Sequence, residues 1–218
     1  YISFKNMFTS RQIFNFDFLF GDISNKYDPF DWEAFNDKSQ KYEAVATDVI
    51  TGESTYFDRD ECSDIVAGVE ASASIPVMSK MIDVEGRKYL DGGVSTSIAY
   101  KRAFDLGYPR AVVVLTREEG YRKKPVNKVN ESIYKRYFKP LPRLVDKLMS
   151  VPERYNEMQK EMEDLANEGK LLIIRPPKKV IVQRLEKSVA KLESLYNEGY
   201  EEGLRNIENV KKFLSQNA

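Results

Sequence analysis

The sequence predicts an α/β protein with a mainly parallel central sheet and helices on both faces. The runs AVVVLT (111–116) and KLLIIRPP (170–177) are short and apolar, as in strands buried on both faces of a parallel sheet. Each run follows a segment with helical spacing, so helices and strands alternate in this half of the chain. No linker or internal repeat interrupts the 218 residues, and we expect a single domain over residues 1–218.

Aromatic side chains crowd the first 35 residues. The run IFNFDFLF (13–20) alternates apolar and polar residues through Phe18, and YDPFDWEAFN (27–36) predicts a turn followed by a short helix. Core packing is the favoured interpretation of this cluster, because aromatic residues build cores by default. A pocket for an acyl chain is the alternative.

Two hairpins and a helix are predicted next. Residues 42–49 and 54–57 flank a Thr51-Gly52 turn, and MIDVEGRKYLDGG (81–93) turns at Glu85-Gly86. Between the two hairpins, CSDIVAGVEASASIPVM (62–78) has helical spacing and small residues that permit close packing. Pro76 ends this helix.

The remaining elements follow the βαβ theme. TSIAYKRAFDLG (96–107) predicts a helix that stops at a glycine, with Ser95 and Ser97 helping to cap its start. REEGYRKKP (117–125) is a loop at the carboxyl end of a strand, and its basic residues are typical of a solvated loop, with lipid headgroups as the alternative partner. A capping box at 150–153 opens a helix that closes at Gly169, and 188–214 predicts a long amphipathic helix that lies on the sheet.

Composition excludes several classes of function. With 34 basic and 34 acidic residues the net charge is zero, and no basic surface predicts nucleic-acid binding. The absence of histidine excludes a Ser-His-Asp triad and a histidine-bound metal within this chain, and we expect neither a metal nor a cofactor. Cys62 stands alone, is typical of a small buried apolar group, and suits a reducing compartment. No run is long enough to span a membrane, so we expect a cytoplasmic protein, with peripheral membrane contact left open.

The stretch KYLDGGVS (88–95) contains the candidate for chemistry. A general base needs a carboxylate that is fixed and approachable. Asp91 follows a strand, and Gly92 and Gly93 allow a sharp turn with no Cβ in the way. Asp-Gly-Gly is also an ordinary turn, so the residues alone leave both interpretations open.

The segment 70–107, which contains this motif, resembles the second signature block of the patatin-like phospholipases. That block has a small-residue helix with Ala-Ser and Pro, then a hairpin, then Asp-Gly-Gly and a helix. VATDVITGE (45–53) and VVVLTREEGYRKKP (112–125) are similar to the bacterial branch of the family, and the resemblance extends over about residues 1–210.

The resemblance implies a three-layer α/β/α sandwich and a Ser–Asp dyad hydrolase that needs no histidine. Asp91 matches the general base, with Gly92 and Gly93 as the rest of its motif. None of the eleven glycines begins Gly-Xaa-Ser-Xaa-Gly, and no run other than Gly92-Gly93 is available for an oxyanion loop. We therefore expect the nucleophilic serine in βα units that precede residue 1 and are missing from this chain.

The expected function of the parent protein is hydrolysis of carboxylic esters or lipids, with this chain inactive alone. A non-catalytic binding or interaction module is the alternative, and a phosphate- or metal-binding turn at Asp91 ranks last. The expected partner is a lipid or small ester, and the oligomeric state stays open.

Overall fold

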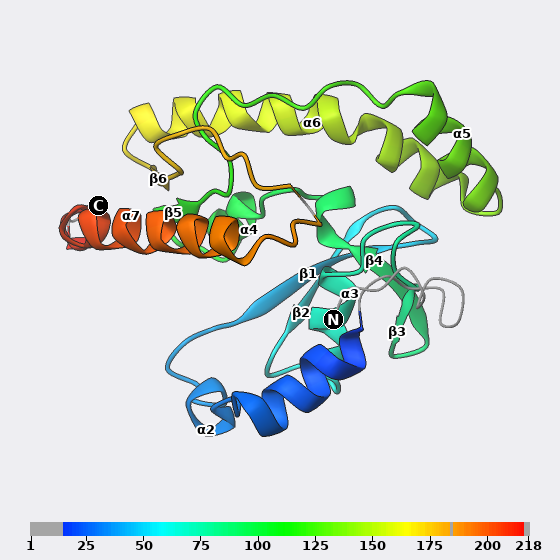
Figure 1. Ribbon diagram of the computed structural model, residues 1–218, viewed down its shortest axis with the longest axis horizontal. Coiled ribbons are helices and arrows are strands. Elements are labelled where there is room, and N and C mark those ends of the chain that lie inside the picture. Colours follow the sequence, from blue (N-terminus) through cyan, green and yellow to red (C-terminus); the bar gives the residue numbers. More distant parts are fainter. Residues whose placement is uncertain (1–14, 184, 216–218) are drawn as a thin grey trace. The chain divides into compact units, whose positions relative to one another are not determined.

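The structure, a computed structural model, describes residues 15–183 and 185–215. The chain divides into two compact units (Figure 1). Unit 1 comprises the described residues up to Ile98 together with Pro125–Val151, and unit 2 comprises Ala99–Lys124 and the described residues from Pro152 onward. The expectation of a single domain stays a prediction.

Unit 1 is built around an antiparallel sheet with the strand order β2-β1-β4-β3. Both predicted hairpins are confirmed. The first joins β1 (Glu43–Asp48) to β2 (Ser54–Asp58), and the second joins β3 (Ile82–Val84) to β4 (Arg87–Asp91). Glu85 and Gly86 both have positive φ, at 53° and 79°, the backbone that a tight two-residue hairpin turn requires.

The two faces of this sheet bury different apolar clusters. Tyr89 packs on one side with Phe57 and with Ala71 of helix α3 (Ile65–Ser72). Leu90, the next residue of β4, packs on the other side with Phe138 and Leu144. This alternation is the period-two pattern of a strand with both faces covered. Gly68 lets α3 approach closely, because a Cβ there would lie 3.0 Å from the Phe57 ring.

Four further helices complete unit 1 or begin in it. The helix η1 (Asp17–Tyr27) has π-type hydrogen bonds, such as Asp28 N–H to the Ile23 carbonyl at 2.9 Å. The short helix α2 (Trp32–Phe35) is confirmed, with Asp31 accepting the Ala34 N–H as its N-cap. The helix α5 (Lys128–Tyr137) follows, and α6 (Pro142–Asn167) crosses from unit 1 into unit 2.

Unit 2 contains two parallel strands, β5 (Ala111–Val114) and β6 (Leu171–Ile174). The helix α4 (Tyr100–Asp105) lies against β5, and α7 (Val189–Ser215) lies against β6. Arg110 ties α7 to the start of β5, because its Nη1 donates to the Phe213 carbonyl at 3.1 Å.

The predicted three-layer sandwich with a mainly parallel central sheet is wrong. The described residues form a four-stranded antiparallel sheet and a separate two-stranded parallel sheet. Hairpins pair neighbouring strands antiparallel, and that local pairing accounts for four of the six strands. The prediction that 111–116 is buried on both faces also fails, because Val114 is 73% exposed.

Two smaller predictions need correction. The helix expected to start at the 150–153 capping box begins at Pro142, and Ser150 Oγ donates instead to the Lys147 carbonyl. Its end is confirmed by Gly169, where φ is +72°. The long C-terminal helix is confirmed, but most of its apolar stripe is exposed, including Val189, Tyr196 and Leu204.

Candidate functional site

Asp91 is the last residue of β4, opposite Ala46 of β1. Its backbone N–H donates to the Ser74 carbonyl at 2.8 Å, just after α3. Its carboxylate oxygen Oδ1 accepts the Gly93 N–H at 2.7 Å and caps the short 3₁₀ turn Gly92–Val94. The side chain is half-buried, and the Gly93 N–H orients the carboxylate.

The two glycines are needed for different reasons. A Cβ on Gly92 would lie 2.2 Å from the Val45 carbonyl oxygen, so no other residue fits without moving β1. A Cβ on Gly93 would lie 3.0 Å from the Asp91 Oδ1 that its own N–H binds. The motif therefore has a full structural role as a strand end and turn, and that role is compatible with a base.

A group of hydroxyls behind Asp91 was missed by sequence reasoning. Thr47 Oγ1 donates to the Asp91 carbonyl at 2.8 Å and lies 2.8 Å from Ser95 Oγ. Ser54 Oγ donates to Ser95 Oγ at 2.8 Å and lies 2.7 Å from Thr96 Oγ1. Thr47 and Ser95 are buried, so these bonds fix β1, β2 and the turn after Asp91 to one another. The one signal in the sequence is the concentration of Ser and Thr at 47, 54 and 95–97.

The serines near Asp91 in sequence have structural partners. Ser95 belongs to the hydroxyl group, Ser97 Oγ donates to the Gly93 carbonyl at 3.1 Å, and the buried Ser74 Oγ donates to the Glu70 carbonyl at 2.8 Å. The prediction that Ser95 and Ser97 cap the next helix is wrong, because α4 begins at Tyr100 with Ala99 as its N-cap.

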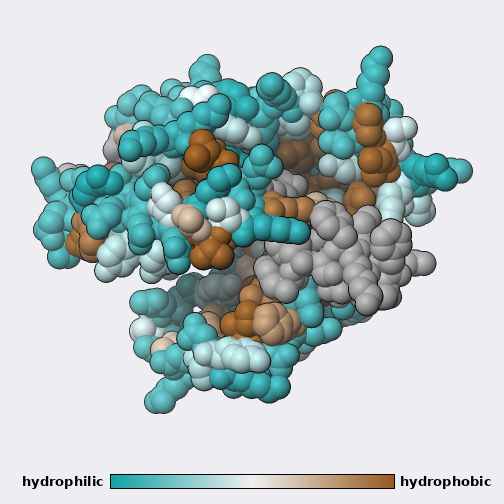
Figure 2. All heavy atoms as spheres, viewed as in Figure 1, coloured by the Kyte–Doolittle hydropathy of each residue, from teal (hydrophilic) through white to brown (hydrophobic). Residues whose placement is uncertain are grey.

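The aromatic residues of the N-terminal segment line an apolar pocket of about 310 Å³ in unit 1. Its walls come from η1, α2, the start of β1 and α3: Phe20, Ser24, Phe30, Trp32, Phe35, Tyr42, Ile65, Val66 and Val69. Figure 2 shows one patch of hydrophobic side chains in the lower part of the view, with mostly hydrophilic side chains around it. Of the aromatic residues between 15 and 35, Phe16 alone is buried, so the favoured core interpretation is wrong for the others. Phe14 and the aromatic residues before it lie outside the described residues.

Arg59 holds the rim of this pocket in place. Its guanidinium lies 5.5 Å from the centre of the Phe35 ring and donates to the Phe35 and Gln40 carbonyls. The side chain is only 6% exposed, so the loop between α2 and β1 is fixed by a buried cation. The sequence carried no signal for this role.

Cys62 is half-buried and packs against the core cluster between the sheet and α3. Burial raises the pKa of its thiol above the ordinary value, so the neutral form is favoured. This agrees with the expected structural role. Among residues 15–183 and 185–215, no group of three or more His, Cys, Asp or Glu side chains is placed to hold a metal ion.

The described part of the chain contains no helix with the length and apolarity needed to cross a bilayer. A search of curated proteins gave no match. In a comparison with protein-family models, residues 141–215 match a domain of unknown function, DUF6363. The matched segment spans α6, β6 and α7, less than half of the chain, and does not include Asp91. The patatin-like resemblance stays a prediction, and the established similarity is that residues 141–215 resemble the DUF6363 family.

Proposed function

We propose that this chain carries the general base of a Ser–Asp dyad hydrolase of carboxylic esters or lipids. In this proposal Asp91 is the base and the nucleophilic serine comes from outside the sequence. The observation that supports it is the placement of Asp91: a half-buried carboxylate at a strand end, oriented by the Gly93 N–H at 2.7 Å. Bases held in this way by backbone bonds can work without histidine.

The chemistry needs Asp91 to take up and release a proton twice. The carboxylate takes the hydroxyl proton of the serine as its oxygen attacks the ester carbonyl, and the proton then passes to the leaving alkoxide. A water molecule next attacks the acyl-serine, again giving its proton to the carboxylate, which returns it to the serine as the acid departs. The donors that stabilise the oxyanion would also come from outside the sequence.

The apolar pocket supports a substrate with a long acyl chain. One wall of the pocket is Ile65, Val66 and Val69 of α3, and the Ser74 carbonyl just beyond that helix binds the Asp91 N–H. The helix α3 is eight residues, about 12 Å, long. The helix that forms one wall of the pocket thus leads to the residue that binds the backbone of Asp91.

The test compares this chain with a longer polypeptide that adds a Gly-Xaa-Ser-Xaa-Gly segment. We expect no hydrolysis of p-nitrophenyl esters and no fluorophosphonate labelling for residues 1–218 alone. In the longer protein, Asp91→Asn should lower kcat about a thousandfold, while Asp83→Asn on the neighbouring strand should leave it unchanged. Asp91-dependent turnover by the 218-residue chain, or full activity of Asp91→Asn in the longer protein, would contradict the proposal.

The second candidate is a non-catalytic module that binds an apolar ligand in the same pocket. It is favoured by the absence of any Gly-Xaa-Ser-Xaa-Gly in this sequence. Trp32 is the only tryptophan and lines the pocket, so its fluorescence reports occupancy directly. Dodecanoate should shift the Trp32 emission to the blue, and Val69→Asp should abolish the shift. Val129→Asp, on the exposed face of α5, should leave the shift intact. If dodecanoate does not change the Trp32 spectrum of the wild-type protein, that result counts against binding in this pocket.

For location, we propose the cytoplasm, with peripheral contact to a membrane. The support is the single cysteine, which suits a reducing compartment. In cell fractionation the full-length protein should appear in the cytosol or be released from membranes by salt. Recovery in a secreted fraction would contradict this location.

A further inference from the structure

A cluster of positive side chains gathers at one edge of the parallel sheet in unit 2. The strands β5 and β6 run in the same direction, so the loop after Val114 and the residue after Ile174 lie at the same edge. In open α/β sheets this carboxyl edge is where ligands bind. The Tyr155 cluster, as we name it, consists of Arg117, Tyr121, Arg122, Lys123, Tyr155, Glu163 and Arg175.

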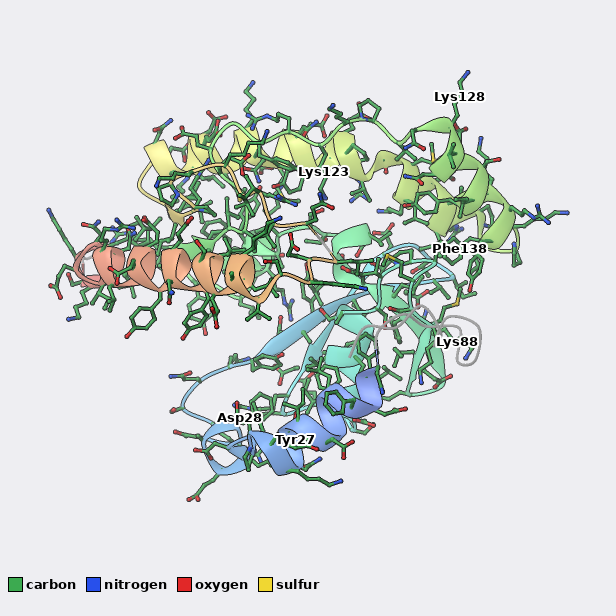
Figure 3. All side chains as sticks on the ribbon, in the orientation of Figure 1. Tyr27, Asp28, Lys88, Lys123, Lys128 and Phe138 are labelled. Atoms are coloured by element: carbon green, nitrogen blue, oxygen red, sulfur yellow. The ribbon has the colours of Figure 1, made fainter. Side chains whose placement is uncertain are left out.

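Two tyrosine rings form the floor of the cluster. They lie 6.0 Å apart at 84°. The side chain of Lys123 lies beside α6 (Figure 3), and its Nζ is 4.2 Å from the centre of the Tyr155 ring. The Arg117 guanidinium lies 5.0 Å from the centre of the Tyr121 ring. Each of these cations therefore sits over an aromatic face, which keeps it in place without neutralising its charge.

Burial and the neighbouring charges have opposite effects on the Tyr155 hydroxyl. Burial raises the pKa of that hydroxyl, and Tyr121 adds to the rise. The positive charges of Arg117, Arg122 and Arg175 act in the opposite direction. Contacts bring the same three guanidiniums together: Arg117 lies over the Tyr121 ring, and Arg122 and Arg175 both approach Glu163 Oε1.

The carboxylates nearby do not satisfy the arginines of the cluster. Glu163 Oε1 lies 3.9 Å from Arg122 Nη2 and 4.0 Å from Arg175 Nη1, beyond hydrogen-bonding distance. Glu118 lies near Arg117, but its Oε2 accepts the Val180 N–H at 3.3 Å. Three guanidiniums, those of Arg117, Arg122 and Arg175, thus face two carboxylates in a chain whose net charge is zero.

Two buried donors at this place lack a hydrogen-bond acceptor among the described residues. One is Nη1 of Arg175, whose side chain is 16% exposed, and the other is Nε2 of Gln159, which is 4% exposed. Tyr155, Gln159 and Glu163 follow one another at four-residue spacing on α6, so Gln159 lies on the helix face that carries the cluster. Buried donors are almost always paired, so both atoms are available to an acceptor that the described residues do not supply.

The loop that supplies most of the cations is held rigidly. Asn156 on α6 binds the backbone of Lys123 twice, accepting its N–H at 2.8 Å and donating to its carbonyl at 3.0 Å. The Arg122 Nη1 donates to the Tyr121 carbonyl at 3.0 Å, which sets the direction of that side chain. The cations are therefore positioned before any ligand arrives.

We propose that the Tyr155 cluster binds a phosphate oxyanion. Guanidinium groups match phosphate oxygens with paired N–H donors, and a tetrahedral anion offers acceptors toward Arg117, Arg122 and Arg175 at once. The excess of positive charge favours a phosphate over a single carboxylate. A phospholipid headgroup and a free phosphate compound present the same chemistry. The proposal concerns residues of unit 2 and does not rest on ester hydrolysis at Asp91.

The test titrates inorganic phosphate into the 218-residue chain by calorimetry, with sodium chloride at equal ionic strength as the reference. We expect saturable phosphate binding that Arg175→Gln weakens about tenfold or more. Arg205→Gln removes the same charge from an exposed position on α7 and should change the affinity less than twofold. Equal binding by the two variants, or no binding beyond chloride, would overturn the proposal.

Two further measurements complete the test. If Arg175→Gln unfolds, as judged by circular dichroism, Arg122→Gln replaces it, because that side chain is 42% exposed and its loss leaves the fold intact. Unweakened phosphate binding by Arg122→Gln would then overturn the proposal. Vesicles of phosphatidylcholine with a fifth phosphatidic acid distinguish the two sources. Sedimentation with these vesicles that phosphate reverses identifies a headgroup site, and phosphate binding without sedimentation identifies a free phosphate compound.

Discussion

At the scale of single residues, Gly92 is the position where the structure leaves least room. It is buried beside β1, and an added Cβ would meet the Val45 carbonyl oxygen at 2.2 Å. We predict that Gly92→Ala lowers the free energy of unfolding by about 3 kcal/mol, because backbone has to move to admit the methyl group. Chemical denaturation followed by circular dichroism measures this.

Gly21→Ala is the matched control in the same unit. It lies within η1, and a Cβ there has no atom within 4 Å. Alanine is the better helix former, so the change should be stabilising and no larger than about 1 kcal/mol. A Gly92→Ala variant as stable as Gly21→Ala would mean that β1 shifts without cost.

Glu70 gives unit 1 a dependence on pH. Burial on α3 raises the pKa of its carboxyl above the ordinary 4.5, while Lys80 acts against the rise. The folded chain then keeps the proton to higher pH than the unfolded chain, so stability falls as the pH rises through this range. We predict that Glu70→Gln flattens the fall in melting temperature between pH 4.5 and 7. Glu198→Gln on α7 removes a carboxylate elsewhere and should keep the wild-type slope; equal slopes for all three proteins would exclude Glu70 as the cause.

Only part of the candidate site around Asp91 could be predicted from the sequence. The position of Asp91 at a strand end was predictable, because hairpin and glycine signals are local. Its support was not predictable, because Thr47 lies 44 residues away and reaches the Asp91 carbonyl only through the β1–β4 pairing. The neighbours of Arg175 were not predictable for the same reason: Glu163 and Tyr155 are distant from it in sequence and come near it only in the folded chain.

At the scale of elements, the sequence pattern around Pro152 led to a wrong prediction of where α6 begins. The Ser150-Val151-Pro152-Glu153 pattern reads as a helix start, yet the helix runs through it from Pro142. Proline has no N–H for the Leu148 carbonyl, so packing of Leu144, Val145 and Leu148 must offset the loss.

We predict that Pro152→Ala raises the free energy of unfolding by about 1–3 kcal/mol, since it restores one helical hydrogen bond and removes a clash. Amide exchange in residues 149–156, followed by mass spectrometry, should slow as well. Pro142→Ala is the control, because the first helical residue has no intrahelical acceptor for its N–H and gains nothing. If Pro152→Ala is no more stable than wild type, the surrounding packing already offsets the full cost of the proline.

The sheets show the limit of local patterns. Both hairpins were predicted to within a residue or two, because Thr51-Gly52 and Glu85-Gly86 specify their turns. The two apolar runs were correctly predicted as parallel strands, and β5 and β6 do pair. How many strands join them is set by contacts between distant segments, which apolar runs do not encode. The two apolar runs therefore did not justify the prediction of a large parallel sheet.

At the scale of the whole molecule, the balance of charge governs how copies of the chain meet. Basic and acidic residues are equal in number, and the isoelectric point is about 6.7. Much of α7 and the aromatic pocket also exposes apolar side chains, among them Tyr196, Tyr200 and Trp32. Without net charge, nothing opposes contact through such surfaces.

We predict that solubility and monodispersity, measured by light scattering at low salt, pass through a minimum near pH 7. Replacing the exposed Lys128 and Lys139 with glutamate changes the net charge from zero to four negative charges and should move the minimum to lower pH. Replacing both with arginine leaves the charge unchanged, and the minimum should stay where it is. A minimum that does not move with the glutamate variant would show that association depends on the apolar surfaces alone, and Tyr196→Lys would then be the variant that relieves it.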